Sequence, residues 1–158
     1  ELELDLADGK LYLSPRLSER GRAEYPGLLR KAIECGNDVA LAANLMEPGM
    51  FNSHEPRTRK GKTSFAKVPV TAPETLAEGE FNRFYLRGLC CRVIDEGKGN
   101  LVAYRARESA KPRPESLAID GKSFDAEQLL RDLRMSGGVD TAFGLPPGPN
   151  SGMSAYIA

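Results

Sequence analysis

The residues of this chain best suited to binding chemistry form a basic run, Arg57-Thr58-Arg59-Lys60-Gly61-Lys62, with four Arg or Lys in six positions and no acid. Lys and Arg neutralise phosphate charge, so the run favours contact with nucleic acid, or docking onto an acidic protein surface. A solvated loop without a partner is the third interpretation. The candidate contact residues of this segment, which include flanking aromatic residues, are Phe51, Arg57, Arg59, Lys60, Lys62, Phe65 and Lys67.

The end of this run, Gly61-Lys62-Thr63, matches the last three positions of a nucleotide-binding phosphate loop. That motif requires a glycine five residues before Gly61, where this chain has Pro56. The segment also lacks a preceding apolar strand and a clear helix start at Thr63, the two elements that build a backbone cradle for phosphate. The sequence therefore excludes a phosphate-binding loop of this type.

Groups for nucleophilic or metal chemistry are few. His54 is the only histidine, and a cysteine–histidine pair would have to combine it with Cys35, Cys90 or Cys91. The last two are adjacent on a largely apolar helix, where a buried thiol is normally inert. No Cys-x-x-Cys or His-x-x-His spacing is present for zinc. We therefore predict a protein that is not an enzyme and uses neither metal nor cofactor.

Arg83 and Arg87 form a second candidate set. They lie one turn apart on an expected long helix that is otherwise mostly apolar. Arginines in such a stripe extend to solvent, pair with carboxylates or reach a partner. We expect intramolecular pairing as the default and keep Arg83 and Arg87 as candidates for partner contact, in a patch that Arg105 and Arg107 could extend.

Composition limits the function classes. The chain has 158 residues, 22 Lys plus Arg and 22 Asp plus Glu, which suits one domain and argues against a generic polyanion binder. No stretch approaches the roughly 18 apolar residues that would span a bilayer, so we expect no membrane contact. An odd number of cysteines favours a reducing compartment. We expect the cytoplasm, or a particle assembled inside the cell.

The start of the chain has the pattern of a β-hairpin. Leu2–Leu6 alternates apolar and polar residues, Asp8-Gly9 is a strong two-residue turn signal, and Lys10–Leu13 would form the return strand. This register places four leucines on one face. We expect a helix to cover them.

Helical spacing and stop signals predict three helices in the next part of the chain. The first begins near Pro26 and ends at Gly36, and the second runs from Val39 to Met46 with Asp38 as its cap. A capping-box pattern of Thr71 with Glu74 starts the third, which ends near Glu96. Apolar residues surround most of this third helix, so we expect it to be the buried central helix.

The last third of the chain predicts strands and one more helix. Leu101–Arg107 alternates as a strand, and Leu117–Ile119 is expected to form a short one. Asp125, with Gln128 three residues later, predicts the N-terminus of a helix. Met153–Ile157 is expected to be a terminal strand.

Two segments keep neither a helical nor a strand period. We expect residues 47–70 to form a basic extended arm or loop, and residues 139–152 to form a Pro/Gly-rich extended segment. The sequence thus predicts a single α+β domain over 1–158: an N-terminal β-hairpin, a central buried helix, two or three further helices and long irregular arms.

The irregular arms carry the functional prediction. Ordering a long loop costs about 1–2 kcal/mol per residue of backbone entropy, and a few apolar anchors on one small domain do not offset that. We therefore expect a non-enzymatic structural protein whose arms pack on copies of itself or on other assembly subunits, as in virion-type particles. The alternative is a nucleic-acid-binding module that uses the basic segment 57–67.

Overall fold

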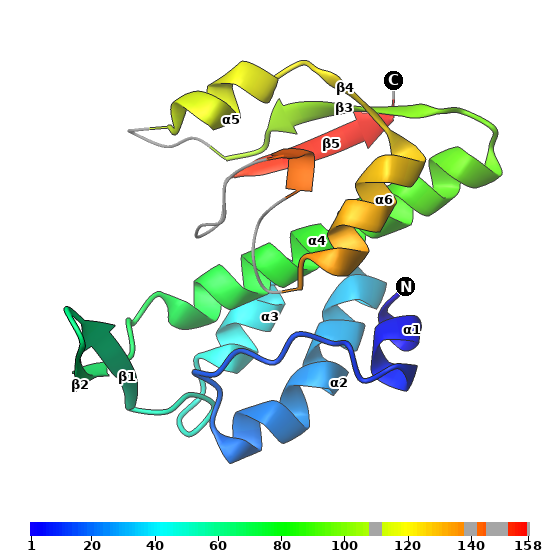
Figure 1. Cartoon of the computed structure of the whole chain (residues 1–158). Coiled ribbons are helices and arrows are strands. Elements are labelled where there is room, and N and C mark those ends of the chain that lie inside the picture. The colour runs from blue at the N-terminus through cyan, green and yellow to red at the C-terminus, as the bar shows by residue number, and fades with distance from the viewer. Residues whose placement is uncertain (108–111, 138–141, 145–151, 158) are drawn as a thin grey trace. The chain divides into compact units, whose positions relative to one another are not determined.

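The computed structural model, shown in Figure 1, describes residues 1–107, 112–137, 142–144 and 152–157. The helices are α1 (Leu2–Ala7), α2 (Glu19–Cys35), α3 (Asp38–Leu45), α4 (Ala72–Asp95), α5 (Pro114–Ile119) and α6 (Ala126–Met135), with a 3-10 helix η1 (Ala142–Gly144). The strands are β1 (His54–Arg59), β2 (Lys62–Lys67), β3 (Asn100–Arg105), β4 (Ser123–Asp125) and β5 (Met153–Ile157).

Contacts between residues gather in two units, which are described separately below. One unit is Tyr12–Phe81, and the other combines Glu1–Leu11 with Asn82–Ala158. The strands form two separate antiparallel sheets, β1-β2 and β4-β3-β5. Helices with antiparallel sheets confirm the predicted α+β class, whereas the organisation as one domain stays a prediction.

In the unit 12–81, α2 begins seven residues earlier than expected. The Ser18 side chain accepts a hydrogen bond from the Gly21 N–H at 2.9 Å and so caps the helix. Pro26 therefore lies inside the helix, where it removes one backbone hydrogen bond. The complete burial of Tyr25 and Leu29 on either side of it stabilises the helix and offsets that cost. The predicted end is confirmed, since Gly36 adopts the left-handed conformation.

The second helix, α3, is also confirmed, with its cap shifted by one residue. Asn37, and not Asp38, accepts the hydrogen bond from the Ala40 N–H at 2.9 Å. Leu41 and Leu45 from this helix are almost fully buried. Helices α2 and α3 pack against each other and build the core of this unit.

Residues 47–52 are anchored to the start of α2 and are not part of a free arm. Met50 is 1% exposed, and its carbonyl accepts a hydrogen bond from the Ser18 N–H at 3.0 Å. A Cβ atom at Gly21 would lie 2.0 Å from the Met50 oxygen, so this close approach requires glycine. The Asn52 N–H donates to the Arg16 carbonyl.

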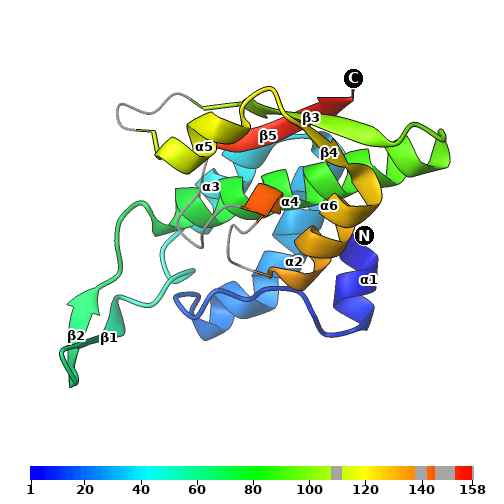
Figure 2. The same ribbon diagram turned by 45° about the horizontal axis from the view of Figure 1, so that its top comes forward.

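The prediction of an irregular arm over 47–70 is wrong for residues 54–67, which form a β-hairpin (Figure 2). The N-terminal half of the chain therefore does contain a β-hairpin, but at residues 54–67 and not at residues 2–13. Lys60 and Gly61 form the turn, with φ of 51° and 73°. Positive φ at both turn residues matches a type I′ turn. This turn usually has the sequence Asn-Gly, so Lys60-Gly61 did not predict a hairpin. Few apolar residues alternate along these strands, because neither face is buried.

In the other unit, the sheet β4-β3-β5 has β3 at its centre (Figure 1). Leu101 and Ala103 on β3 and Ala155 on β5 are completely buried and face the core. Leu86, Cys90 and Val93 of α4 and Leu129, Leu130 and Leu133 of α6 belong to the same core. The predicted strand at Leu101–Arg107 is confirmed as far as Arg105, where β3 ends, and the one at Met153–Ile157 is confirmed in full. The buried character of α4 in this unit is also confirmed.

The predicted hairpin at residues 2–13 is wrong, because residues 2–7 form α1. Asp8-Gly9 ends this helix, with Gly9 at φ 65° and the Lys10 N–H bonded to the Asp5 carbonyl at 2.8 Å. A helix end and a hairpin turn both require a left-handed glycine, so Asp-Gly is compatible with either. Leu2 is buried, whereas Leu4 is 55% exposed.

The expected strand at Leu117–Ile119 is also wrong, because these residues end α5, which starts at Pro114. Proline suits the first turn of a helix, and this start signal outweighs the short apolar run. Most of the expected extended segment 139–152 lies outside the described residues. Its described part contains the short η1, in which Phe143 is 6% exposed and joins the core.

The N-terminus of α6 offers a direct test of a predicted cap. The Asp125 carboxylate accepts a hydrogen bond from the Gln128 N–H at 2.8 Å. We expect Asp125→Ala to lower the free energy of unfolding by about 1 kcal/mol, measured in urea melts. Asp125→Asn should stay within a few tenths of the parent because Asn caps equally well. Equal losses in both variants would contradict this role of the carboxylate.

Candidate nucleic-acid interface on the β1–β2 hairpin

The β1–β2 hairpin sorts its side chains onto two faces. Cross-strand partners share a face, and successive pairs along the ladder alternate between faces. The pairs Glu55↔Ala66, Arg57↔Ser64 and Arg59↔Lys62 define what we call the cationic face. The pairs His54↔Lys67, Pro56↔Phe65 and Thr58↔Thr63 define the Phe65 face.

Positive charge is concentrated at the distal end of the hairpin. Arg59 and Lys62 lie directly opposite each other, and Lys60 stands in the turn between them. All three are exposed, and no acid among the described residues forms an ion pair with them. Like charges placed directly across a ladder repel each other, so this end of the hairpin is poised for an anion.

The base of the hairpin is closer to neutral. The Glu55 carboxylate accepts hydrogen bonds from Arg16, one of them from Nη2 at 3.0 Å. Arg57 contacts the same carboxylate through its own Nη2 at 3.3 Å. Arg16 links the base of β1 to the segment before α2. Within the described parts of the chain, Arg57 is the one cation of the cationic face that has an acid partner. Lys67, at the base on the other face, is exposed.

Charge is unevenly distributed along the chain. Residues 54–67 contain five Arg or Lys and one Glu, a formal charge of +4. Because the whole chain has zero net charge, the remaining residues sum to −4. Overall neutrality therefore hides a strongly basic element and does not exclude local phosphate binding.

The two aromatic candidates of the segment are separated by the structure. Phe65 is 77% exposed on β2, opposite Pro56. Phe51 lies outside the hairpin, is half-buried, and forms an isolated β-bridge with Leu17. Only Phe65 belongs to the same hairpin as the distal cations, and it lies on the face opposite Arg59 and Lys62.

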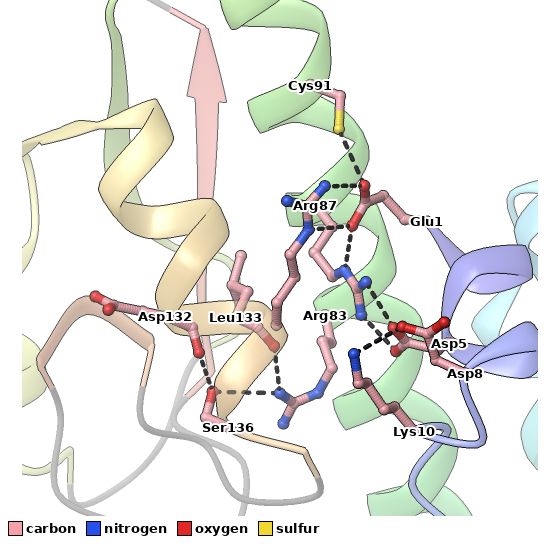
Figure 3. A network of polar contacts seen from close by, with 11 residues as sticks. Glu1, Asp5, Asp8, Lys10, Arg83, Arg87, Cys91, Asp132, Leu133 and Ser136 are labelled. Atoms are coloured by element: carbon pink, nitrogen blue, oxygen red, sulfur yellow. Dashed lines mark hydrogen bonds and ion pairs between the residues drawn. The ribbon is translucent and has the colours of Figure 1, made fainter.

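Arg83 and Arg87 are not available as partner contacts, which corrects that part of the predicted site. They are 8% and 2% exposed and belong to the unit that contains Glu1–Leu11 and Asn82–Ala158 (Figure 3). Arg83 donates hydrogen bonds to the Leu133 carbonyl at 3.2 Å and to the Ser136 hydroxyl at 3.4 Å. The default expectation of intramolecular pairing is the one that the structure supports.

Arg87 is the centre of a buried ion-pair network. Its Nη1 and Nη2 donate to the two Asp5 oxygens at 2.6 and 2.9 Å, and its Nε donates to Glu1 at 2.7 Å. The guanidinium also lies 4.9 Å from the centre of the Phe84 ring. Arg134 of α6 binds the same Glu1 carboxylate at 2.6 Å. Sequence reasoning missed Asp5 because it placed this residue on a strand, and it assigned no contact to Glu1, which precedes that strand.

The surroundings shift the ionisation of this network. Hydrogen bonds from Arg134 and Arg87 lower the pKa of Glu1 to about 2, against the opposing effect of burial. Burial acts to lower the pKa of Arg87, but its hydrogen bonds to Asp5 and Glu1 outweigh that effect and raise it. Both groups are therefore charged at neutral pH.

The cysteines on α4 do not form a reactive site. Burial raises the pKa of Cys90 to about 12 and also raises that of Cys91, whose thiol donates to Glu1 at 3.5 Å. Neither sulfur is then a thiolate at neutral pH, which is the form that reacts. In the part of the chain that the structure describes, no group of three or more His, Cys, Asp or Glu could hold a metal ion.

Comparison of the chain with protein-family models, with curated proteins and with solved structures found no match. Among the described residues, no helix is both long enough and apolar enough to span a membrane.

The Arg87 network predicts a large stability effect at one position of α4 and a small one nearby. Arg87→Ala leaves two carboxylates without their buried cation, so we expect it to lower the free energy of unfolding by about 3 kcal/mol or more. Arg92→Ala removes a solvent-exposed pair with Glu96 and should leave the urea midpoint almost unchanged. Similar midpoints for the two variants would contradict the central role of Arg87.

The network also predicts a specific acid sensitivity. The folded pKa of Glu1, about 2, lies below its ordinary value of 4.5. Its contribution to stability is therefore complete above pH 4.5 and is lost as the pH falls toward about 2. We expect the free energy of unfolding of Glu1→Gln to fall less steeply over this range in urea melts.

The matched control is Glu96→Gln, because Glu96 pairs with Arg92 and Lys98 in contact with solvent. Screening by water should make its contribution smaller than that of Glu1, so this variant should keep most of the parent's pH dependence. A Glu1→Gln curve that is parallel to the parent's would refute the assignment.

Proposed function

We propose that this chain is a non-enzymatic nucleic-acid-binding protein that contacts phosphate through the distal end of the β1–β2 hairpin. The observation that carries the proposal is the cluster of Arg59, Lys60 and Lys62. These exposed cations have no acid partner among the described residues, and two of them stand directly opposite each other. A polyanion relieves their mutual repulsion and releases its own counterions on binding.

The shape of the element favours nucleic acid over an acidic protein as the partner. A two-stranded ribbon fits the major groove of a duplex, which is about 12 Å wide. Hydrogen bonds between its two strands hold the hairpin in one extended shape, so it reaches a groove as a preformed ribbon and not as a loop that must be ordered on binding. It can also follow a single strand, where phosphates lie close enough for neighbouring cations to contact them.

The expected role as a subunit of a homo-oligomeric or virion-type assembly is the second candidate. Its original basis was the entropy of ordering a structureless arm, and this does not apply to a hydrogen-bonded hairpin. The exposed Phe65 side chain supports self-association instead. Both candidates assume a reducing location in the cytoplasm or in an intracellularly assembled particle, where the three free cysteines stay reduced.

The test of nucleic-acid binding is the salt dependence of affinity for a short labelled oligonucleotide, single-stranded and duplex, between about 50 and 200 mM salt. Arg59→Gln with Lys62→Gln removes two phosphate contacts. The slope of log affinity against log salt should become shallower by about 1.8 for duplex DNA. Folding should be unaffected, because both side chains are exposed.

The control is the pair Lys31→Gln with Arg131→Gln, which lowers the net charge equally but lies on α2 and α6. It should keep the parent slope, whereas an equal loss in both double variants would show a non-specific charge effect. Absence of salt-dependent binding by the parent chain would eliminate this function.

A further inference from the structure

The Phe65 face of the hairpin has the properties of a protein contact, unlike the cationic face. Its six residues, His54, Pro56, Thr58, Thr63, Phe65 and Lys67, are all exposed. A two-stranded hairpin is at best marginally stable unless one of its faces packs on something. We propose that a second copy of this chain covers this face, with Phe65 packing against Phe65 of the partner about a two-fold axis.

The distribution of charge favours a copy of the chain as the occupant. Arg57, Arg59 and Lys62 point to the opposite face, so the middle and distal part of the Phe65 face has no charged side chain. Two copies can approach through it without bringing these cations together. A polyanion, by contrast, gains nothing from this neutral surface and prefers the cationic one. In an antiparallel arrangement, Lys67 at the base of one hairpin lies beside the uncharged pair Thr58↔Thr63 of the other.

The polar atoms of the Phe65 face are suited to burial. The hydroxyls of Thr58 and Thr63 are 3.1 Å apart and hydrogen-bond to each other, so desolvating them leaves neither without a partner. Pro56 has no N–H to offer to an added strand, which disfavours edge-to-edge pairing along β1. Face-to-face packing is therefore the favoured mode, and a two-fold axis makes the contact self-complementary.

The size of the surface sets the expected strength. Stable interfaces bury about 1,200–2,000 Å² in total, and six side chains from each copy supply less than that. The dimer should therefore be weak and depend on concentration, with a dissociation constant in the micromolar range or above. It does not rest on nucleic-acid binding, because it uses the other face of the hairpin.

The experiment measures the dimerisation of the full chain by sedimentation equilibrium from micromolar to millimolar concentration. Phe65→Thr keeps a strand-forming residue but removes the aromatic anchor, and it should weaken dimerisation by about tenfold or more. Thr63→Lys places like charges in the symmetric contact and should abolish it. Ser64→Lys adds the same charge to the adjacent residue on the cationic face and should leave dimerisation intact.

These outcomes separate face-to-face dimerisation from edge pairing of two hairpins and from simple charge repulsion. A monomer at every concentration overturns it. Equal effects of Thr63→Lys and Ser64→Lys also overturn it, because they would indicate edge pairing or simple charge repulsion. Phe65→Thr should keep the parent's salt-dependent binding to the oligonucleotide, measured per protomer, and Arg59→Gln with Lys62→Gln should still dimerise. Failure of nucleic-acid binding and failure of dimerisation are thus detected independently.

Discussion

The buried guanidinium of Arg87 is the constraint on which its unit is built. A charge that is 2% exposed is tolerated only when it is paired and hydrogen-bonded, and Asp5 and Glu1 provide both. These two acids are four residues apart, a spacing that brings them to one side of a helix but also to one side of a strand. The bidentate Asp5 contact, together with burial of Leu2, favours the helix. Arg134 then joins α6 to the same carboxylate.

Elements with local end signals were predicted well, and those that depend on distant contacts were not. Asp125 and Gly36 terminate helices through bonds within a few residues, so the sequence carries the whole signal. The first turn of the chain was misread because the partner of its acids lies more than 80 residues away. The hairpin at 54–67 was missed because it has no packing partner among the described residues that would require an apolar face. Neither of its faces is buried, so its strands lack the apolar alternation that predicts a strand, and Lys60-Gly61 is an uncommon turn pair.

The candidate site was predicted in part, and the division has a physical basis. The type of a side chain is a property of the sequence, so the cluster at Arg59, Lys60 and Lys62 was recognised directly. Whether a cation is free depends on what lies opposite it in space. Arg87 looked similar to Arg59 in sequence, yet one is buried between two carboxylates and the other is exposed in a ribbon.

The two-residue period of a β-strand gives the hairpin a property that a basic loop would lack. It holds Arg59 and Lys62 on one side and Phe65 on the other within a few residues of chain. If two copies pack through Phe65, their cationic faces point away from each other. Such a dimer contacts two separate segments of nucleic acid and bridges them, and its two weak sites gain from effective concentration when both segments belong to one molecule. Assembly and nucleic-acid binding are then compatible properties of one short element.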